Sequence, residues 1–600
     1  MLPMNSNEAK ARHDHAHCVL AQPAIHQNIE RIPMKHTILT LTALLLAPLA
    51  ALPAAETRPA KPNILLILAD DLGYADIGCH GSEIQTPNLD RLAGNGLRFT
   101  EFYNAGRCCP TRASLLSGLY PHQAGIGHMT GDSGLPGYRG DLSKQCVTIA
   151  EVLRAGGYRT YMAGKWHVTK TEYKFARTGS RDNWPLQRGF DRFFGTPSGG
   201  GSYFDPATLT RDNQLVPPGN DFYYTDAIGE NAARFVAEHD RTRPFFLYVA
   251  FTAPHWPLHA KPEDIAKYKG RYDQGWDALR EERYQRQLTM GLIDKRWALS
   301  PRAAGAPAWK DAKDQPHQAR LMEVYAAQVD SMDQNIGRIL ESLKTARQLD
   351  NTLILFLSDN GGEAADVYLM PASVQRPLGK EEIQYDLAPK FSRAGLPVRT
   401  GHGVVPGPAD TYCAYRLPWA NASDTPFRYF KEFTHEGGIA TPLIAHWPAG
   451  IKRKGEFERQ PGHLIDIMAT CVDLAGVKYP AKFNGQTIQP MEGRSLVPAF
   501  TGGTIQRSEP LLWEHEGNRA LRQGKWKLVA KGANGLWELY DLENDRTELH
   551  NLAAEHHGKA VELATLWEKQ ARRTRMIPWP WKPPFTQSNG ITTAEEPASK

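Results

Sequence analysis

The sequence has few cysteines, little net charge and no long apolar run after its N-terminal region. Seven cysteines in 600 residues are too few for a disulfide scaffold. Pairing remains open among Cys79, Cys146, Cys413 and Cys471. A net charge of +5 gives no basis for a nucleic-acid-binding surface. No later stretch is long and apolar enough to cross a bilayer, and we find no internal repeats.

The composition is that of a soluble globular protein, with 41% hydrophobic and 22% charged residues. A chain of 600 residues is too long for one ordinary compact core. We therefore expect a large domain over residues 56–504, a smaller one over 505–580 and a flexible tail over 581–600.

The N-terminal region has the layout of an export signal. Residues 34–55 combine a basic start, a short apolar run and a small-residue end, which is typical of a secretory signal peptide. We interpret Met34 as the true start and residues 1–33 as a mis-assigned upstream extension. The alternative is a membrane anchor, but Pro48 and Pro53 interrupt the apolar run, which is short for a span. The sequence thus predicts an exported protein, periplasmic or secreted.

A buried strand precedes the first pair of candidate ligands. The apolar run 63–69 suggests a strand covered on both faces, and it ends in Asp70 and Asp71. Ligands of such sheets collect at the carboxyl ends of strands. Paired carboxylates suit Ca²⁺ or Mg²⁺, although the pair could equally cap the following turn.

The stretch 107–118 combines a cysteine, a proline and an arginine at fixed spacing before a helical pattern. Pro110 suits the first turn of a helix, and the helix N-terminus favours an anion at Cys108. A thiol there should be unusually acidic. The alternative is a vicinal pair with Cys109 that is structural, redox-active or metal-binding. Arg112 follows four residues after Cys108.

Two further strands end in candidate cationic or acid–base residues. Strand 160–163 leads to Lys165 and His167, which alternation along an extended segment places on one side as an anion site. Strand 244–251 leads to His255, held in a proline-flanked turn that suits positioned acid–base chemistry. Either histidine alone would more often be structural.

A last buried strand, 352–358, ends in Asp359 and Asn360. Together with the first carboxylate pair, they supply four oxygen-bearing side chains for a hard cation. Lys431 lies four residues before a His-Glu-Gly-Gly sequence. Residues 258–315 and 363–430 lack clear periodicity, and we interpret them as excursions that shape the substrate site. Within or beside them, Trp256 and Trp419 either stack on a substrate ring or belong to the core.

The predicted fold class is α/β. We expect a large, mixed, mostly parallel sheet sandwiched by helices. Short aromatic-rich strands between residues 511 and 541 predict a smaller antiparallel sheet, with a helix over 559–573 packed on it.

The stretch from Cys108 to Gly118 closely resembles the signature of type I sulfatases, which belong to the alkaline phosphatase superfamily. Gly164 to His167 resembles the second sulfatase signature, and Lys431 resembles the family's remaining sulfate-binding lysine. The motifs follow the family's order, and the resemblance covers roughly residues 60–540.

The resemblance implies a cofactor, a modification and two partners. A maturation enzyme would oxidise Cys108 to formylglycine, and the other partner is a sulfate ester substrate. One Ca²⁺ is implied, with Mg²⁺ less favoured. Its implied ligands are Asp70, Asp71, Asp359, Asn360 and an oxygen of the modified Cys108.

The resemblance also implies a covalent cycle. A hydroxyl of the hydrated aldehyde attacks sulfur while His255 protonates the leaving oxygen, and His167 then deprotonates the other hydroxyl to release sulfate. Asp359 accepts the proton of the attacking hydroxyl. Positive charge around the ester and the hydrate comes from Lys165, Lys431 and Arg112, with Lys165, His255 and Lys431 binding substrate.

Departures from the family pattern are few. Cys109 replaces a common serine, and Leu116-Ser117-Gly118-Leu119 replaces a frequent Leu-Thr-Gly-Arg. The sequence leaves open whether the substrate is an aryl or a carbohydrate sulfate. One alternative is a phosphodiesterase or phosphonate monoester hydrolase of the same superfamily, and another is an inactive sulfated-glycan-binding protein.

Overall fold

The computed structural model describes residues 61–170, 179–367, 372–401 and 403–580. The described residues belong to one compact unit that begins at Lys61. The predicted signal peptide and C-terminal tail lie outside them. Within the described ranges, no helix has the length and apolarity needed to cross a membrane.

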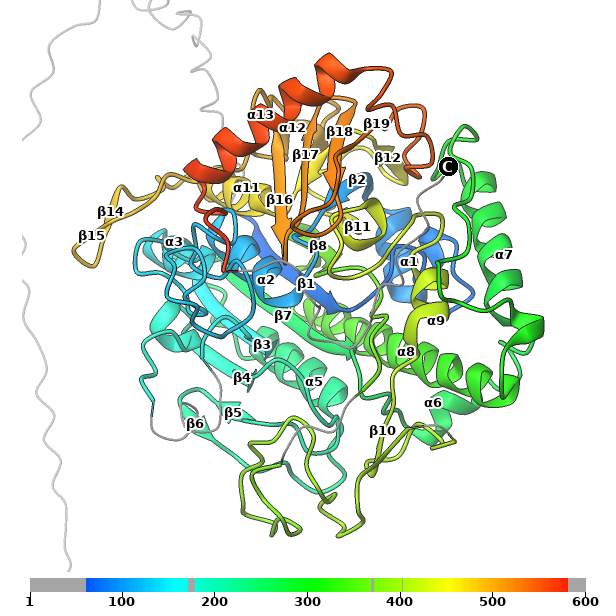
Figure 1. The fold of residues 1–600 in the computed structure, drawn as a ribbon. Coiled ribbons are helices and arrows are strands. Elements are labelled where there is room, and N and C mark those ends of the chain that lie inside the picture. The colour runs from blue at the N-terminus through cyan, green and yellow to red at the C-terminus, as the bar shows by residue number, and fades with distance from the viewer. Residues whose placement is uncertain (1–60, 171–178, 368–371, 402, 581–600) are drawn as a thin grey trace, which may run out of the picture. The chain divides into compact units, whose positions relative to one another are not determined.

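A large mixed sheet forms the centre of this unit (Figure 1). Its strand order is β12-β2-β11-β8-β1-β7-β3-β4-β5-β6, with β13 pairing β2. The strands span β1 (Asn63–Asp70), β2 (Leu97–Tyr103), β3 (Arg159–Lys165), β4 (Arg192–Thr196), β5 (Thr210–Arg211), β6 (Gln214–Leu215), β7 (Phe245–Pro254), β8 (Thr352–Ser358), β11 (Ala440–His446), β12 (Glu456–Glu458) and β13 (Gly462–His463). Strands β8, β1, β7, β3 and β4 are parallel, whereas β11 is antiparallel to β8 and β2. The predicted mixed, mostly parallel sheet is confirmed.

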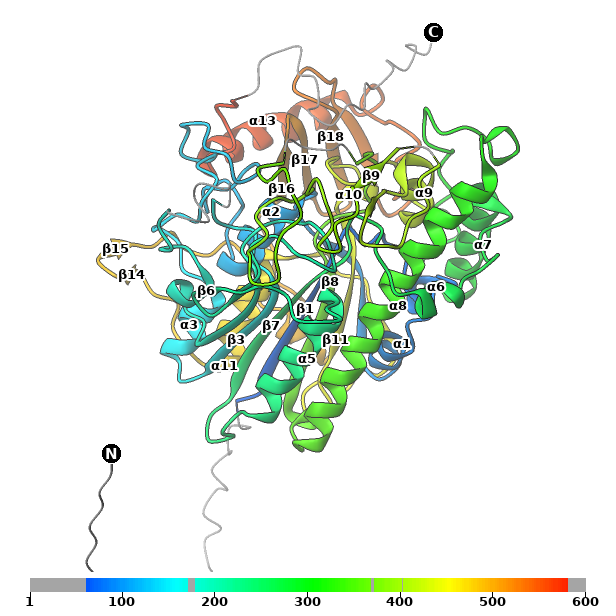
Figure 2. The same cartoon turned by 90° about the horizontal axis from the view of Figure 1, so that it is seen from below.

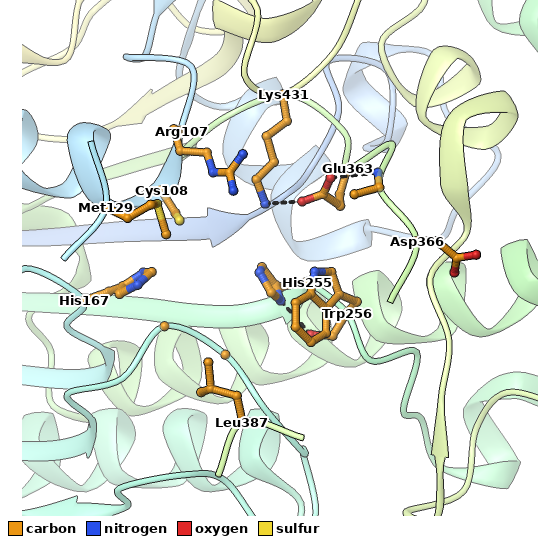
Figure 3. A pocket seen from close by; sticks show the side chains of 13 residues that line it. Arg107, Cys108, Met129, His167, His255, Trp256, Glu363, Asp366, Leu387 and Lys431 are labelled. Carbon is orange, nitrogen blue, oxygen red and sulfur yellow. Dashed lines mark hydrogen bonds and ion pairs between the residues drawn. The ribbon is translucent and has the colours of Figure 1, made fainter. Parts of the chain in front are cut away.

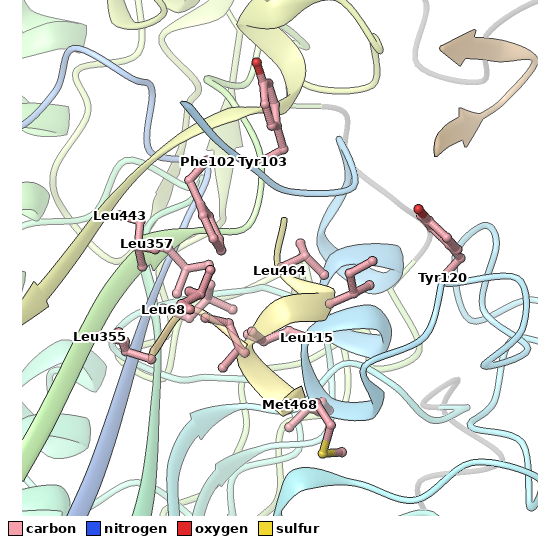
Figure 4. Packing of buried hydrophobic residues seen from close by; sticks show 14 of the residues in the cluster. Leu68, Phe102, Tyr103, Leu115, Tyr120, Leu355, Leu357, Leu443, Leu464 and Met468 are labelled. Atoms are coloured by element: carbon pink, nitrogen blue, oxygen red, sulfur yellow. The ribbon is translucent and has the colours of Figure 1, made fainter. Parts of the chain in front are cut away.

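Helices cover both faces of the sheet (Figure 2). Their spans are α1 (Pro87–Gly94), α2 (Cys108–Ser117), α3 (Ile149–Ala155), α5 (Tyr224–Ala237), α8 (Gln315–Thr345) and α11 (Ile465–Ala475). Alternate residues of β1 enter two separate cores. Leu66 and Leu68 share one with residues of α2, α3 and α11. Figure 4 shows Leu68 of this core with Leu115 of α2 and Met468 of α11. Leu65 and Ile67 share the other with residues of α1, α5 and α8. Burial on both faces explains the continuous apolar run of β1.

A smaller antiparallel sheet follows near the C-terminus, as predicted. It comprises β16 (Leu511–His515), β17 (Asn518–Gln523), β18 (Trp526–Ala530) and β19 (Glu538–Asp541), and α13 (His557–Arg573) packs on it. Trp513 and Leu521 belong to the same core as Leu115 of α2. The Trp513 indole also donates a hydrogen bond to the Asn104 carbonyl over 2.8 Å. The domain boundary at residue 505 stays a prediction.

The two expected excursions contain regular structure. Residues 258–315 form α6 (Pro262–Ala266), α7 (Gly275–Thr289) and η3 (Trp309–Asp311), and the later region contains β9 (Arg399–Thr400), β10 (Thr411–Tyr412) and α9 (Arg416–Ser423). Trp419 is buried against Trp276 and Trp309, so it belongs to the core.

The remaining short elements are η1 (Gly78–His80), η2 (Pro185–Arg188), η4 (Leu349–Asn351), α10 (Glu436–Ile439), α12 (Val497–Phe500), β14 (Lys482–Phe483) and β15 (Gln486–Thr487). The six cysteines of the described ranges are all free thiols, so the candidate disulfides do not form in this structure.

Candidate active site

The sheet brings the predicted polar residues together because four neighbouring parallel strands end at the same edge. Asp70 ends β1, Asp359 follows β8, Lys165 ends β3 and His255 follows β7. The carboxyl edge of a parallel sheet is where ligands bind in α/β folds. The order β8-β1-β7-β3 therefore assembles residues that are distant in the sequence, such as Asn360 and Asp71, which are hydrogen-bonded although they lie 289 positions apart.

Cys108 is the first residue of α2, and Arg107 precedes it in an extended conformation. The thiol is buried. A hydrogen bond with the Cys109 thiol lowers the pKa of Cys108 well below its usual range, and the charges of Lys165 and His167 lower it further, against the effect of burial. Burial raises the pKa of Cys109 instead. The acidic member of the pair is thus the cysteine within the signature motif.

The four oxygen-bearing residues meet in a buried cluster. The Asn360 amide donates to Asp71 Oδ1 over 2.7 Å, and the Asp71 backbone N–H donates to Asp359 Oδ1 over 3.2 Å. Within the part of the chain that the structure describes, Asp70 Oδ1, Asp71 Oδ2 and Asn360 Oδ1 are buried without a hydrogen-bond partner. Buried polar atoms are rarely left unpaired. Oxygen atoms are the donors that a hard divalent cation prefers, so these residues fit a calcium ion.

Arg112 is fully buried and contacts two carboxylates of this cluster. Its guanidinium donates to Asp359 Oδ2 from Nη2 over 2.8 Å and from Nε over 3.1 Å. It also donates to the Lys165 carbonyl over 2.9 Å and lies 3.5 Å from Asp70 Oδ2. Burial and the charge of Asp70 raise the pKa of Asp359. Arg112 is absent from the lining of the cavity described below.

Two lysines bind opposite ends of the carboxylate pair. The Lys165 ammonium contacts Asp70 Oδ2. The Lys431 ammonium lies 2.7 Å from Asp71 Oδ1. It also lies 2.5 Å from Glu363 Oε2, a contact that Figure 3 shows. Although burial alone would raise the pKa of Asp71, Lys431 and His255 lower it to about 2. Lys431 lines the cavity described below, whereas Lys165 is fully buried and is absent from that lining.

The two predicted histidines face the cavity from different backbone contexts. His167 lies beside Cys108. Strand alternation does not place it there, because β3 ends at Lys165 and His167 has a φ of 54°. His255 Nε2 lies 3.6 Å from Asp71 Oδ2, and its Nδ1 lies 2.6 Å from the Trp256 carbonyl. Burial lowers the pKa of each histidine to about 4. Both rings are therefore neutral at pH 7 before an anion arrives.

A glycine loop that sequence reasoning missed gives both histidines room. A Cβ on Gly199 would lie 2.1 Å from His167 Cε1, which is too close for any side chain. A Cβ on Gly200 would lie 3.1 Å from His255 Cε1. The run of glycines at 199–201 was the available signal, since glycine often marks a close approach.

These groups surround a cavity of about 200 Å³ (Figure 3). Its charged and reactive lining consists of Cys108, His167, His255, Lys431, Arg107, Glu363 and Asp366. Its other lining residues are Met129, Gly199, Gly200, Trp256, Ala365 and Leu387. Sequence reasoning missed Arg107 and Glu363, although each directly adjoins a motif. The cavity combines fixed positive charge, two neutral histidines and an acidic thiol at its wall.

Comparisons with known proteins agree with this geometry. A family model described as Sulfatase matches residues 62–477, and one described as N-sulphoglucosamine sulphohydrolase, C-terminal, matches residues 426–575. An uncharacterized sulfatase of Schizosaccharomyces pombe is 35% identical, covering 88% of this chain and 96% of that protein. The arylsulfatase of Klebsiella aerogenes is 32% identical, covering 73% of this chain and 91% of its own length.

Solved structures share the fold. The crystal structure of Ps i-CgsB in complex with k-i-k-neocarrahexaose superposes with a TM-score of 0.61 at 26% identity, covering 86% of this chain and 94% of that one. A structure in complex with D-glucosamine-2-N,6-O-disulfate has a TM-score of 0.57 at 21% identity, covering 87% of this chain and all of that one.

Proposed function

The chain belongs to the sulfatase family and hydrolyses sulfate esters, and from that premise we propose how its own residues divide the work. The observation that supports the proposal most directly is the buried set of unpartnered oxygens beside the acidic Cys108. One half of this arrangement suits a cation, and the other half suits a modified nucleophile.

Asp70, Asp71, Asp359 and Asn360 would hold one Ca²⁺. Their oxygen donors suit Ca²⁺, and Mg²⁺ usually keeps several waters, which a set of fully buried ligands disfavours. A bound cation there would supply Lewis-acid stabilisation of charge on the sulfuryl oxygens. Arg112 keeps the Asp359 carboxylate in place through its two hydrogen bonds.

Cys108 is the residue we propose to be converted to formylglycine by a maturation enzyme. The hydrated aldehyde would supply the attacking oxygen and a second hydroxyl. His167, neutral and next to residue 108, is placed to take a proton from that second hydroxyl. Lys165 and Lys431 provide the fixed positive charge that an anionic ester needs.

His255 is the proposed proton donor to the leaving oxygen. Its pKa of about 4 means that the free protein holds the ring unprotonated at pH 7. A sulfate ester beside the ring would raise that pKa, because an anion favours the charged imidazolium. We therefore propose that substrate and proton arrive together, so that the acid forms only when an ester is bound.

The substrate class we propose is an aryl or carbohydrate sulfate monoester, and the site of action is the periplasm or the extracellular space. Trp256, which lines the cavity next to His255, offers a flat apolar surface to a ring. The signal-like sequence at 34–55 supports export.

Two measurements on purified protein test the proposal. The first compares turnover of an aryl sulfate with that of a phosphodiester and a phosphonate monoester of the same phenol. We expect the sulfate to be preferred, and a preference for either phosphorus ester would overturn the assignment. The second is mass spectrometry of the peptide that contains Cys108, for which we expect an aldehyde. An intact thiol in fully active protein would contradict the nucleophile.

A further inference from the structure

A second group of metal-ligating side chains lies outside the cavity, where the turn between β16 and β17 meets the segment after α2. Its members are His128, His515 and Glu516, whose ligand atoms all lie within 4.8 Å of one another. His128 Nε2 lies 2.7 Å from Glu516 Oε1, and His515 Nε2 lies 3.8 Å from the same oxygen. The two imidazole rings are stacked, with centroids 5.5 Å apart. None of the three takes part in the proposed reaction.

His515 is fully buried, and neither of its ring nitrogens has a hydrogen-bond partner among the described residues. A neutral imidazole ordinarily donates from one nitrogen and accepts at the other, and buried polar atoms are almost always paired. Burial lowers the pKa of His515 to about 4, so the ring is neutral at pH 7. A neutral ring offers the lone pair that metal ligation requires.

The turn that carries Glu516 adopts an unusual conformation for glutamate. His515 pairs with Asn518, and the two residues between them, Glu516 and Gly517, have φ values of 52° and 81°. Positive φ at both central positions defines a type I′ hairpin turn, which favours Asn or Gly at both. A glutamate in the left-handed region is strained, and such strain concentrates at functional sites. Here it places a carboxylate between two imidazoles.

We propose that His128, His515 and Glu516 bind a divalent transition-metal ion, Zn²⁺ being the best fit, and that this ion pins the β16–β17 turn to the segment that contains His128. Two imidazoles and one carboxylate suit Zn²⁺ rather than the all-oxygen preference of Ca²⁺. Ligands about 2.1 Å from a tetrahedral zinc lie about 3.4 Å apart. The two separations from Glu516 Oε1, 2.7 and 3.8 Å, bracket that value.

The surroundings of the cluster can accommodate the added charge. The charge of Arg107 contributes to lowering the pKa of Glu516, and the Arg107 guanidinium is ion-paired with Glu432. The Asn518 side chain donates to the Glu432 carbonyl over 3.0 Å and so ties the turn to the same region. Met129, next to His128, lines the active-site cavity. The site would therefore hold one wall of the cavity against the C-terminal sheet.

The test uses the full-length chain without an affinity tag, dialysed against a chelator and then kept in saturating Ca²⁺. Cobalt titration followed by visible absorption, with zinc as competitor, reports the number and affinity of nitrogen-ligated sites. We expect the wild-type chain to have one such site. Its zinc affinity should be at least about 10-fold lower in both His515→Gln and Glu516→Gln. His550→Gln, at an exposed histidine next to Asp545, is the matched control and should leave the affinity unchanged. The histidines within residues 1–36 are present in every variant, so any metal that they bind cancels when the variants are compared.

Glu516→Gly is a second test variant, which separates loss of the metal from loss of the fold if a histidine variant does not fold. Glycine adopts the positive φ of this turn without strain, so the metal-free variant should be at least as stable as the unmodified chain. It lacks the carboxylate, however, and zinc should no longer raise its melting temperature. Equal zinc affinity in the unmodified chain and in Glu516→Gly would overturn the proposal, as would the absence of cobalt absorption from the unmodified chain.

Discussion

The Lys431 ammonium lies 2.7 Å from Asp71 Oδ1, whereas Asp71 Oδ2 is buried without a hydrogen-bond partner among the described residues. The two oxygens of one carboxylate thus have different environments. Oδ1 is ion-paired with Lys431, which lines the cavity, and Oδ2 lies 3.6 Å from His255 Nε2. The charges of Lys431 and His255 lower the pKa of Asp71 to about 2, so this carboxylate is ionised at pH 7. Under the proposal above, Asp71 would join the cation site to the substrate cavity.

We expect Asp71→Asn to reduce calcium content and sulfate ester turnover together. The amide keeps the size of the side chain but removes the charge that Lys431 and the cation share. Calcium per chain after dialysis, measured by atomic emission, should fall well below that of the unmodified protein. Asp366→Asn, at the rim of the same cavity, should retain its calcium. Full calcium content in Asp71→Asn would remove Asp71 from the ligand set.

Cys108→Ala and Cys109→Ala should have opposite outcomes. Cys108→Ala removes the proposed nucleophile precursor, and we expect turnover to fall at least about 10⁴-fold, to the level of catalysis that remains without a nucleophile. Cys109→Ala removes a buried thiol whose pKa is raised, so turnover should change by less than about 10-fold. Steady-state assays with an aryl sulfate compare them. Wild-type turnover in Cys108→Ala would refute covalent catalysis at this residue.

The sequence predicts residues at strand ends well, because a buried parallel strand carries a readable signal. The apolar run before Asp70 requires a strand covered on both faces, and the chain can be polar only where that strand stops. Asp359 follows the same rule after β8. The placement of such residues was therefore predictable from local pattern, whereas their mutual contacts came from the sheet order β8-β1-β7-β3.

Long-range partners and unusual backbone conformations were not predictable. Arg107 pairs with Glu432 across 325 positions, and no local pattern marks either residue as a partner of the other. His167 reaches the cavity through a positive φ rather than through strand alternation. The contact between Arg112 and Asp359 also needed the structure, because the two residues lie 247 positions apart in the sequence.

His255→Gln should impair turnover of poor leaving groups more than that of good ones. If His255 protonates the leaving oxygen, an alkyl sulfate should lose about 10²–10⁴-fold in kcat/KM, whereas a nitrophenyl sulfate should lose much less. His167→Gln is the matched control, because a base acting after the leaving group has gone should not discriminate between the two esters. Equal losses for both esters in His255→Gln would show that His255 does not act as the leaving-group acid.

His463 provides a stability prediction that is independent of the active site. Its side chain is fully buried near Tyr120 and Trp513, and the Ile465 backbone N–H donates to its Nδ1 over 3.3 Å. Its Nε2 has no hydrogen-bond partner within the described ranges. Burial and the charge of Arg507 lower the pKa of His463 to about 3. The folded protein therefore holds this ring neutral where an unfolded chain would protonate it.

As the pH falls from the usual histidine pKa of about 6.5 toward about 3, the unfolded state binds a proton at His463 that the folded state does not. This residue alone should then lower the free energy of unfolding by about 1.4 kcal/mol per pH unit, whereas above about pH 6.5 it should not change that free energy. His463→Asn keeps an acceptor for Ile465 but cannot titrate. Urea unfolding of both proteins at several pH values measures the difference in their free energies of unfolding. The other buried histidines are present in both proteins and cancel from that difference. Parallel curves over that window would mean that His463 is protonated in the folded protein.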